Sequence, residues 1–240
     1  MEKFRDLIEF EDQDFIVINK PYNISTLDDR DATRQNILKM AKEYSIDAQV
    51  CHRLDKETSG ILVIAKNPEA YRHMSMQFEN REVIKIYHAV VEGNKRLENE
   101  MVELPILALK DGIVKIDGAG KEAATIFNTL EVYGKYSLIA CFPITGRMHQ
   151  IRIHLSSIGV PIVADAQYGG KDIFLSSLKR NFKLKKDTEE LPLIRRVALH
   201  ARSITFRDLK GKEVTVEAKY PKDFGALIRQ LEINASLRPF

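Results

Sequence analysis

A chain of 240 residues is long enough for one large domain or two small ones, with a sizeable core. Hydrophobic residues make up 44% and charged residues 30%, which excludes a disordered or low-complexity chain. The net charge of +3 is compatible with nucleic-acid binding but does not require it. No apolar run approaches the ~20 residues of a membrane span, and residues 1–6 lack the apolar segment of a signal peptide. We therefore expect a cytoplasmic protein with no membrane partner.

The chain has two cysteines, Cys51 and Cys141, and they form no close-spaced metal or redox motif. Free thiols in a reducing compartment are the simplest interpretation. This agrees with the expected cytoplasmic location.

The first predicted elements are two short strands. One begins near Leu7, and the polar residues 11–14 form a turn into the second strand, 15–19, which ends before Pro21. Residues 33–44 have apolar side chains at helical spacing and predict a short helix.

Residues 51–60, CHRLDKETSG, precede the apolar run 61–65, which predicts a buried strand. The alternation around residues 50–55 predicts an extended segment in which Arg53 and Asp55 share one face. A cation and a carboxylate at the end of a core strand could form part of a catalytic site. On spacing alone, a charged connection between two strands is the favoured interpretation.

After this stretch, Asn67 and Pro68 predict the start of a helix whose residues Tyr71, Met74 and Phe78 face the core. Residues 83–93 then predict a strand on which Tyr87 shares a face with Ala89 and Val91. A tyrosine in this position most often packs in the core.

Residues 105–117 predict a hairpin around Asp111-Gly112, and residues 123–132 and 137–143 predict two further strands. So many adjoining strands favour an antiparallel or mixed sheet over repeated strand–helix–strand units. The expected fold class is therefore α+β, with a mixed, mostly antiparallel sheet flanked by helices.

Residues 145–159 predict a helix capped by Thr145 and ended by Gly159. Its apolar stripe consists of Met148, Ile151, Leu155 and Ile158. Arg152 lies at the edge of this stripe, where a cation can reach inward.

Residues 171–196 form a basic segment, which includes Lys179, Arg180, Lys183, Lys185, Lys186, Arg195 and Arg196. A solvated loop or insertion is the favoured interpretation, and a phosphate-contacting arm is the alternative. A hairpin from strands 197–206 and 213–220 and a helix over 223–231 complete the chain.

Three stretches resemble the signatures of the RluA family of pseudouridine synthases. They are His52-Arg53-Leu54-Asp55 with Thr58-Ser59-Gly60, then Lys85-x-Tyr87-x-Ala89-x-Val91-x-Gly93, and Thr145-Gly146-Arg147-x-His149-Gln150-Ile151-Arg152-x-His154-Leu155 with Asp165-x-x-Tyr168-Gly169. Residues 20–21 and 199–201 are also similar to family features. The resemblance covers the chain from about the first strand to the last helix.

The resemblance implies an enzyme that isomerises uridine within RNA to pseudouridine, with Asp55, Tyr87 and Arg152 as catalytic residues. Asp55 matches the catalytic aspartate, Tyr87 the active-site tyrosine, and Arg152 the basic residue that pairs with the aspartate. Burial favours a protonated carboxyl group, whereas a neighbouring guanidinium favours the ionised form. The isomerisation has no net redox change and no group donor, so we expect no cofactor and no metal.

The implied partner is structured RNA, either ribosomal RNA or tRNA. Reaching the target base requires flipping it out, and Arg53 is the expected residue to fill the gap or hold a phosphate. Further RNA contacts are expected from Arg147, His149, Gln150, Lys183, Lys185 and Lys186. We expect residues 1–240 to form a single catalytic domain, monomeric and without a separate N-terminal RNA-binding domain.

The sequence departs from the family pattern at Met148, where a small hydroxyl residue is usual, and at Ala164, where glycine is usual. One alternative is a metal hydrolase using His149, His154 and Asp55, although two histidines five residues apart do not share a helix face. The other alternative is a non-catalytic RNA-binding module, which would not need an aspartate–arginine pair.

Overall fold

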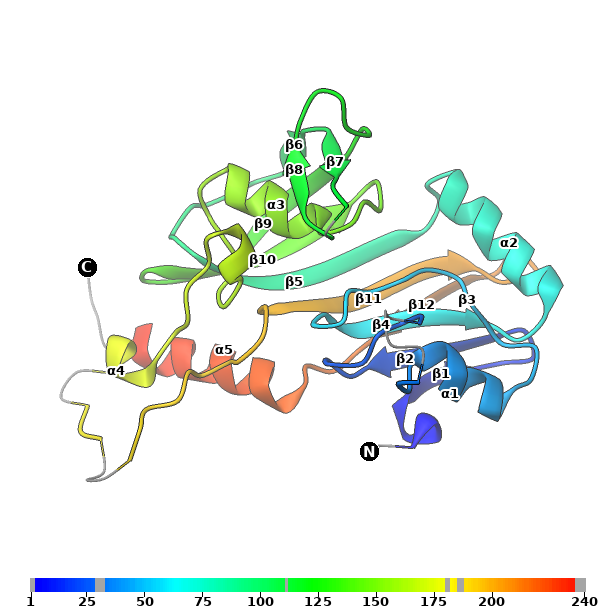
Figure 1. The fold of residues 1–240 in the computed structure, drawn as a ribbon, viewed down its shortest axis with the longest axis horizontal. Coiled ribbons are helices and arrows are strands. Elements are labelled where there is room, and N and C mark those ends of the chain that lie inside the picture. Colours follow the sequence, from blue (N-terminus) through cyan, green and yellow to red (C-terminus); the bar gives the residue numbers. More distant parts are fainter. Residues whose placement is uncertain (1–2, 29–32, 111, 180–181, 185–187, 236–240) are drawn as a thin grey trace. The chain divides into compact units, whose positions relative to one another are not determined.

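The structure is a computed structural model that describes residues 3–28, 33–110, 112–179, 182–184 and 188–235 (Figure 1). It divides into two compact units. The first comprises Met1–Tyr87 and His200–Tyr220, and the second comprises His88–Leu199 and Pro221–Phe240. Each unit is described by itself below.

The first unit is built around strand β4 (Ser59–Ala65), all of whose residues are buried. Its other strands are β1 (Ile8–Glu11), β2 (Phe15–Lys20), β3 (Gln49–Val50), β11 (Leu199–Arg207) and β12 (Glu213–Glu217). Strand β2 pairs with β1 and β4, β3 pairs with β4, and β12 pairs with β11, all antiparallel; β11 runs parallel to β4. These strands lie side by side in Figure 1.

Both faces of β2 and β4 are covered by apolar side chains. On one face, Ile16, Ile18, Leu62 and Ile64 pack with residues of helix α1 (Ile37–Tyr44). On the other face, Phe15, Val17, Ile61 and Val63 pack with residues of helix α2 (Pro68–Glu79). This two-sided burial explains why both strands are continuous apolar runs without polar alternation. The short 3₁₀ helix η1 (Phe4–Leu7) contributes Phe4 and Leu7 to the α1 side.

Gly60 allows β4 and β11 to approach closely. Its φ angle is 113°, and a Cβ atom at this position would overlap the backbone carbonyl of Ala201. Only glycine fits a backbone conformation and a close approach of this kind. The glycine of the Thr58-Ser59-Gly60 stretch is therefore required by packing.

The predicted helix at Asn67-Pro68 is confirmed, because the Asn67 side chain caps α2 by accepting a hydrogen bond from the Ala70 amide at 2.8 Å. The prediction that Tyr71 faces the core is wrong, since its side chain is 37% exposed. The extended segment predicted for residues 50–55 is also wrong: β3 ends at Val50 and residues 51–58 form a loop. Helix α1 begins at Ile37 rather than near Thr33.

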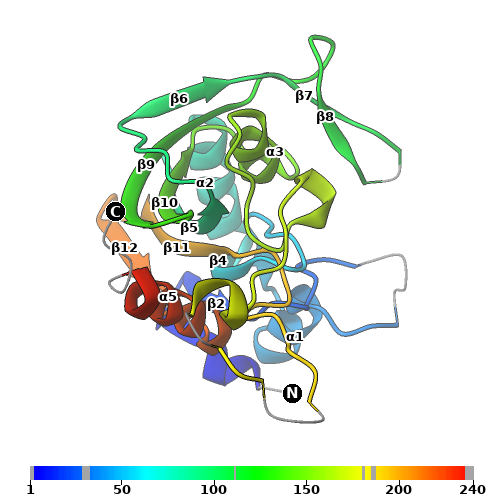
Figure 2. The same ribbon diagram turned by 90° about the vertical axis from the view of Figure 1, so that its left-hand side faces the viewer.

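The second unit contains a curved set of strands (Figure 2). In order these are β5 (Ile84–Glu92), whose first residues belong to the first unit, then β10 (Tyr136–Pro143), β9 (Ala124–Tyr133) and β6 (Glu100–Glu103). Strand β9 is antiparallel to both β10 and β6. Strands β7 (Ile106–Ala108) and β8 (Val114–Ile116) form a separate antiparallel hairpin. Residue 111 of the predicted Asp111-Gly112 turn lies outside the described residues.

Helix α3 (Gln150–Ser157) lies against β9 and β10, as Figure 2 shows. The prediction that this helix starts at Thr145 is wrong. Residue His149 has a left-handed φ angle of 53° and precedes the first helical residue, so residues 145–149 form a turn before the helix. The unit also contains η2 (Ala166–Tyr168), α4 (Leu175–Leu178) and α5 (Lys222–Ala235).

The expected fold class, α+β with a mixed and mostly antiparallel sheet flanked by helices, is confirmed. In the described part of the chain, no helix combines the length and the apolar character that crossing a membrane requires.

Candidate active site

The loop that carries Asp55 is held from both sides. Leu54 is 4% exposed, its amide donates to Thr26 Oγ1 at 3.2 Å, and its carbonyl accepts from the same hydroxyl at 2.9 Å. On the other side, the Thr58 amide donates to the Asp55 carbonyl at 3.0 Å. The Asp55 side chain is half-buried and that of Arg53 is exposed. The backbone beside the carboxylate is therefore fixed, although it is not part of a strand.

A fully buried lysine, Lys20, ties this loop to the segment that follows β2. Its ammonium donates to the carbonyl oxygens of Pro21, Ile24 and Lys56 at 3.0, 2.9 and 3.4 Å. The Asn23 amide donates to the same Lys56 carbonyl at 2.8 Å. A buried charge is tolerated only when it is well solvated by polar groups, and these carbonyls serve that purpose. The Lys20-Pro21 pair is visible in the sequence, but its local pattern does not indicate this role.

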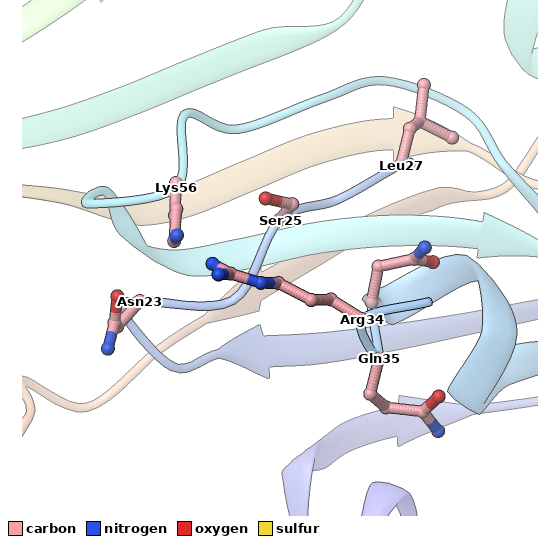
Figure 3. Close-up of a pocket in the computed structure, with 7 residues that line it drawn as sticks. Asn23, Ser25, Leu27, Arg34, Gln35 and Lys56 are labelled. Carbon is pink, nitrogen blue, oxygen red and sulfur yellow. The ribbon is translucent and has the colours of Figure 1, made fainter. Parts of the chain in front are cut away.

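A pocket of about 150 Å³ lies next to this loop (Figure 3). It is lined by Asn23, Ser25, Leu27, Arg34, Gln35, Asn36 and Lys56. Among the described residues, the lining contains two cationic side chains and no carboxylate, and Figure 3 shows the Arg34 guanidinium directed into the space near Lys56 and Asn23. These groups suit an anion such as a phosphate. The pocket could not be predicted from the sequence, because its residues come from three separate segments.

Tyr87 is half-buried and packs against the apolar cluster that contains Leu54, Ile18 and Ala201. It therefore belongs to the same face of the first unit as the residue that precedes Asp55. The core packing expected from the strand pattern and the role implied by the family resemblance are compatible at this position.

His52 and Lys85 both lie beside the ring of Phe78. The His52 and Phe78 ring centres are 5.2 Å apart, and the Lys85 ammonium lies 5.9 Å from the centre of the Phe78 ring. Burial, and secondly the charge of Lys85, lowers the pKa of His52 to about 3, while burial lowers the pKa of Lys85 to about 8. His52 is thus neutral at pH 7, and its Nε2 accepts a hydrogen bond from the Val63 amide at 3.1 Å. This histidine supports the loop structurally.

Arg152 forms a two-pronged ion pair with Asp165 in the second unit. Its Nε donates to Asp165 Oδ2 and its Nη2 to Asp165 Oδ1, both at 2.7 Å, and Nη2 also donates to Gln167 Oε1 at 3.1 Å. The side chains of Arg152 and Asp165 are only 8% and 1% exposed. The role of Asp165 as partner of Arg152 is not predicted from the sequence, although Asp165 belongs to the Asp165-x-x-Tyr168-Gly169 stretch that resembles a family signature.

Tyr168 connects Arg152 with His149. The guanidinium carbon of Arg152 lies 4.9 Å from the centre of the Tyr168 ring, a cation–π contact. The Tyr168 hydroxyl and His149 Nδ1 are within hydrogen-bonding distance at 2.9 Å, and the Tyr168 carbonyl accepts from Ser156 at 2.7 Å. The start of α3 and the segment 165–168 are thereby held together.

Gln150 is buried at the start of α3, and all its hydrogen bonds lie inside the protein. Its Nε2 donates to the Ala124 carbonyl and to Thr125 Oγ1, both at 2.9 Å, and its Oε1 accepts from Thr145 Oγ1 at 2.7 Å and the Arg147 amide at 3.0 Å. These bonds use both donors and both acceptor positions of the amide. These bonds give Gln150 a structural role in the turn before α3, and the expected RNA contact by Gln150 stays a prediction.

The structure shows the surroundings of Met148 and the backbone conformation of Ala164, the two departures from the family pattern. Met148 packs with Ile116 and Ile153 in the cluster between the β7–β8 hairpin and α3. Ala164 has a left-handed φ angle of 61°, a conformation in which glycine carries no steric penalty. Ala164 directly precedes Asp165.

His154, the residue of the metal-site alternative, is buried and bonded through both ring nitrogens. Nδ1 lies 3.0 Å from Thr125 Oγ1 and Nε2 lies 3.0 Å from the Leu104 carbonyl, and burial lowers its pKa. These contacts argue against a role as a metal ligand. Across the described residues, no group of three or more His, Cys, Asp or Glu side chains is arranged to hold a metal ion.

The basic segment 171–196 is only partly described. Lys183 is exposed, whereas Arg180, Lys185 and Lys186 lie outside the described residues. Arg196 is not a solvated cation, because its side chain is buried and forms an ion pair with the partly exposed Asp223, with Nε–Oδ2 at 2.8 Å and Nη2–Oδ1 at 3.1 Å.

The predicted site residues thus fall into two groups. Arg53, Asp55 and Tyr87 belong to the first unit, and Arg147, His149, Gln150 and Arg152 belong to the second. The pairing of Asp55 with Arg152 stays a prediction.

Comparison with known proteins identifies the class of protein that this fold and these motifs define. Residues 14–157 match the family model described as RNA pseudouridylate synthase. Over 237 residues the chain is 35% identical to a ribosomal large subunit pseudouridine synthase C of Buchnera aphidicola, covering 95% of this chain and 71% of the relative. A ribosomal large subunit pseudouridine synthase D of Zymomonas mobilis is 31% identical over 243 residues, covering 95% of this chain and 73% of the relative.

The solved structure of human RNA pseudouridylate synthase domain containing 4 has the same fold, with a TM-score of 0.71, 24% identity and 95% of each chain covered. The chain belongs to the RNA pseudouridylate synthase family, as its resemblance to the RluA signatures predicted. It is an RNA pseudouridine synthase, so the alternative of a non-catalytic RNA-binding module is not retained.

Proposed function

We propose that this enzyme converts one or more uridines of ribosomal RNA to pseudouridine. The single observation that supports this substrate most strongly is the similarity over nearly the whole chain to relatives named for the large ribosomal subunit. Structured tRNA is the alternative substrate. The first and second units act together as one catalytic domain in this proposal.

In the proposed reaction, the bond between the ribose C1′ and the uracil N1 breaks, the base turns, and a bond forms between C1′ and C5. The C5 proton is lost and N1 gains a proton, so atoms and electrons balance without a cofactor. Asp55 acts on the ribose, either by attacking C1′ or by removing a neighbouring sugar proton. Both routes require its ionised form, and the tightly held backbone at Leu54 and Thr58 supports this role by limiting the positions its carboxylate can adopt.

Tyr87 offers a flat ring for stacking on the uracil and a hydroxyl near the ring carbon that loses its proton. In this proposal Arg152 pairs with Asp55 and orients its carboxylate.

RNA contacts are proposed for both units. Arg53 is exposed, and the cationic pocket with Arg34 and Lys56 lies beside the Asp55 loop, so this part of the surface suits the phosphates next to the target nucleotide. Arg147 and His149 lie at the start of α3, and Lys183, Lys185 and Lys186 are proposed to add phosphate contacts. The monomeric state, the cytoplasmic location and the absence of a cofactor stay predictions.

The Asp55→Asn variant tests the catalytic proposal. It keeps the shape of the side chain but removes its charge, so single-turnover release of tritium from C5-labelled uridine in RNA should be abolished while RNA binding persists. Asp47→Asn is the matched control, because Asp47 is an exposed aspartate in the turn before β3. If Asp55→Asn releases tritium at the rate of Asp47→Asn, Asp55 is not the catalytic carboxylate.

A further inference from the structure

The pocket beside the Asp55 loop is held in shape by hydrogen bonds between its own segments. The Ser25 carbonyl accepts from the Ile37 amide at 3.0 Å, which ties the segment after β2 to the first residue of α1. The Lys56 carbonyl accepts from the Asn23 amide at 2.8 Å, which ties the same segment to the loop. All of these residues belong to the first unit, so the pocket is a formed feature of that unit alone.

The side chains that line the pocket match the chemistry of a phosphate group. Arg34 supplies a guanidinium, whose fork of N–H donors fits two oxygens of a phosphate, and Lys56 supplies a second positive charge. Figure 3 shows the Arg34 guanidinium pointing into the space near Lys56 and Asn23. Asn23, Ser25 and Gln35 can add uncharged amide and hydroxyl donors.

The size of the pocket also suits one small group. Its volume of about 150 Å³ is below the roughly 300–1,000 Å³ of pockets that enclose drug-sized ligands. A single anionic group such as a phosphate is therefore a ligand of suitable size and charge.

The start of α1 adds to the positive potential of the pocket. Gln35 and Asn36, the two residues before α1, both line it. The Asn36 side chain accepts from the Lys39 amide at 3.0 Å and so caps the helix. The N-terminal end of a helix carries a partial positive charge, which favours an anion nearby. The Asn36 side chain also donates to Asp28 at 2.8 Å, and the ion pair of Asp28 with Lys39 at 3.1 Å offsets the charge of this carboxylate.

We infer that this pocket is a subsite for a single phosphate group, which in the working enzyme is an RNA phosphate beside the target uridine. Lys56 directly follows Asp55 in the chain, so an RNA whose target ribose reaches Asp55 brings neighbouring phosphates to the pocket. This inference rests on the proposed function, because that function supplies the RNA and the role of Asp55. A discrete subsite differs from a general attraction between a basic surface and RNA, because it fixes the register of one phosphate.

Phosphate-ethylation interference tests this inference. A transcript of the ribosomal RNA segment that wild type modifies is sparsely ethylated, which removes the charge of individual phosphates, and bound RNA is separated from unbound RNA. Molecules ethylated at the subsite phosphate should be depleted about tenfold to a hundredfold from the RNA bound to wild type, because charge-assisted hydrogen bonds are lost. With Arg34→Gln, the depletion at this one position should largely disappear, whereas depletion at other phosphates should persist.

Two further variants make the test specific. Lys56→Gln should remove the depletion at the same phosphate as Arg34→Gln. The matched control is Arg72→Gln, because Arg72 is an exposed arginine of α2, which packs on the face of the sheet opposite α1. This control should reproduce the wild-type pattern. The inference would be overturned if Arg34→Gln also reproduced that pattern, or if Arg34→Gln and Lys56→Gln affected different phosphates.

Titration of the free protein with inorganic phosphate separates RNA from other sources of the same group. The amide NMR signals of Gln35 and Asn36 should shift on adding phosphate to wild type and Arg72→Gln, and should not shift in Arg34→Gln. Phosphate binding of this kind, combined with an interference pattern that Arg34→Gln leaves unchanged, would mean that the pocket takes a free phosphate and not the RNA. Failure of the proposed function is distinguishable, because wild type would then form no pseudouridine in any ribosomal RNA transcript, whereas the phosphate titration would still report on the pocket.

Discussion

Replacing Arg152 with methionine should destabilise the protein as well as inactivate it. The substitution leaves Asp165, whose side chain is 1% exposed, without the partner of its two 2.7 Å hydrogen bonds. Breaking a buried ion pair by removing one member costs about 3–5 kcal/mol. At about 2–4 °C per kcal/mol for a chain of this size, the unfolding midpoint should fall by roughly 6–20 °C. Thermal unfolding followed by circular dichroism measures this change.

The double variant Arg152→Met, Asp165→Leu separates stability from activity. Replacing both members of a buried ion pair with apolar residues is often neutral or stabilising, so most of the lost stability should return. Activity should not return, because Asp55 still lacks the proposed guanidinium. The account would be refuted if Arg152→Met had the midpoint of wild type, or if the double variant regained wild-type turnover.

Two further predictions concern the first unit. The double variant Arg34→Gln, Lys56→Gln should weaken RNA binding and flatten its salt dependence in filter-binding titrations, because two cations are lost from the pocket. The control Lys42→Gln removes an exposed cation of α1 outside the pocket and should have a smaller effect. Equal effects of the two changes would show that the pocket has no special role in RNA binding. The free energy of unfolding should fall as the pH decreases below about 6.5, by up to ~1.4 kcal/mol per pH unit. The reason is that the pKa of His52 is lowered to about 3 in the folded state, so the unfolded state takes up the proton first. His52→Gln should reduce this slope in urea titrations across that range, and an unchanged slope would show that His52 is not the titrating group.

The elements that could be predicted from the sequence are those with a strong local signal. Strand β4 is buried on both faces and is a continuous apolar run, and α2 begins at an asparagine cap followed by proline. The separate functional motifs could also be recognised, because they lie in short contiguous stretches.

The features that could not be predicted depend on contacts between distant residues. The polar–apolar alternation at residues 50–55 indicated a strand, but hydrogen bonds between Leu54 and Thr26 hold this segment as a loop. The start of α3 was placed too early, because Gln150 binds Thr145 and the backbone at Arg147 and stabilises a turn there. The role of Lys20 likewise depends on carbonyls from two loops.

The pairing of Arg152 with Asp165 is the most consequential of these long-range contacts. The family resemblance directed attention to a single partner for the arginine, Asp55. The structure adds a second carboxylate from 13 residues further along the chain. Local periodicity gives no information about such a contact, since Asp165 lies between a turn and the short 3₁₀ helix η2 rather than in a long regular element.

The central claim, that this enzyme makes pseudouridine in ribosomal RNA through Asp55, is tested most directly by mapping pseudouridines in cells. Ribosomal RNA and tRNA from cells lacking the protein, and from the same cells supplied with wild type or Asp55→Asn, are treated with carbodiimide and read by reverse transcription. The account predicts that at least one ribosomal RNA signal disappears without the protein, returns with wild type, and does not return with Asp55→Asn. A pseudouridine pattern that is unchanged in all ribosomal RNA when the protein is absent would contradict it.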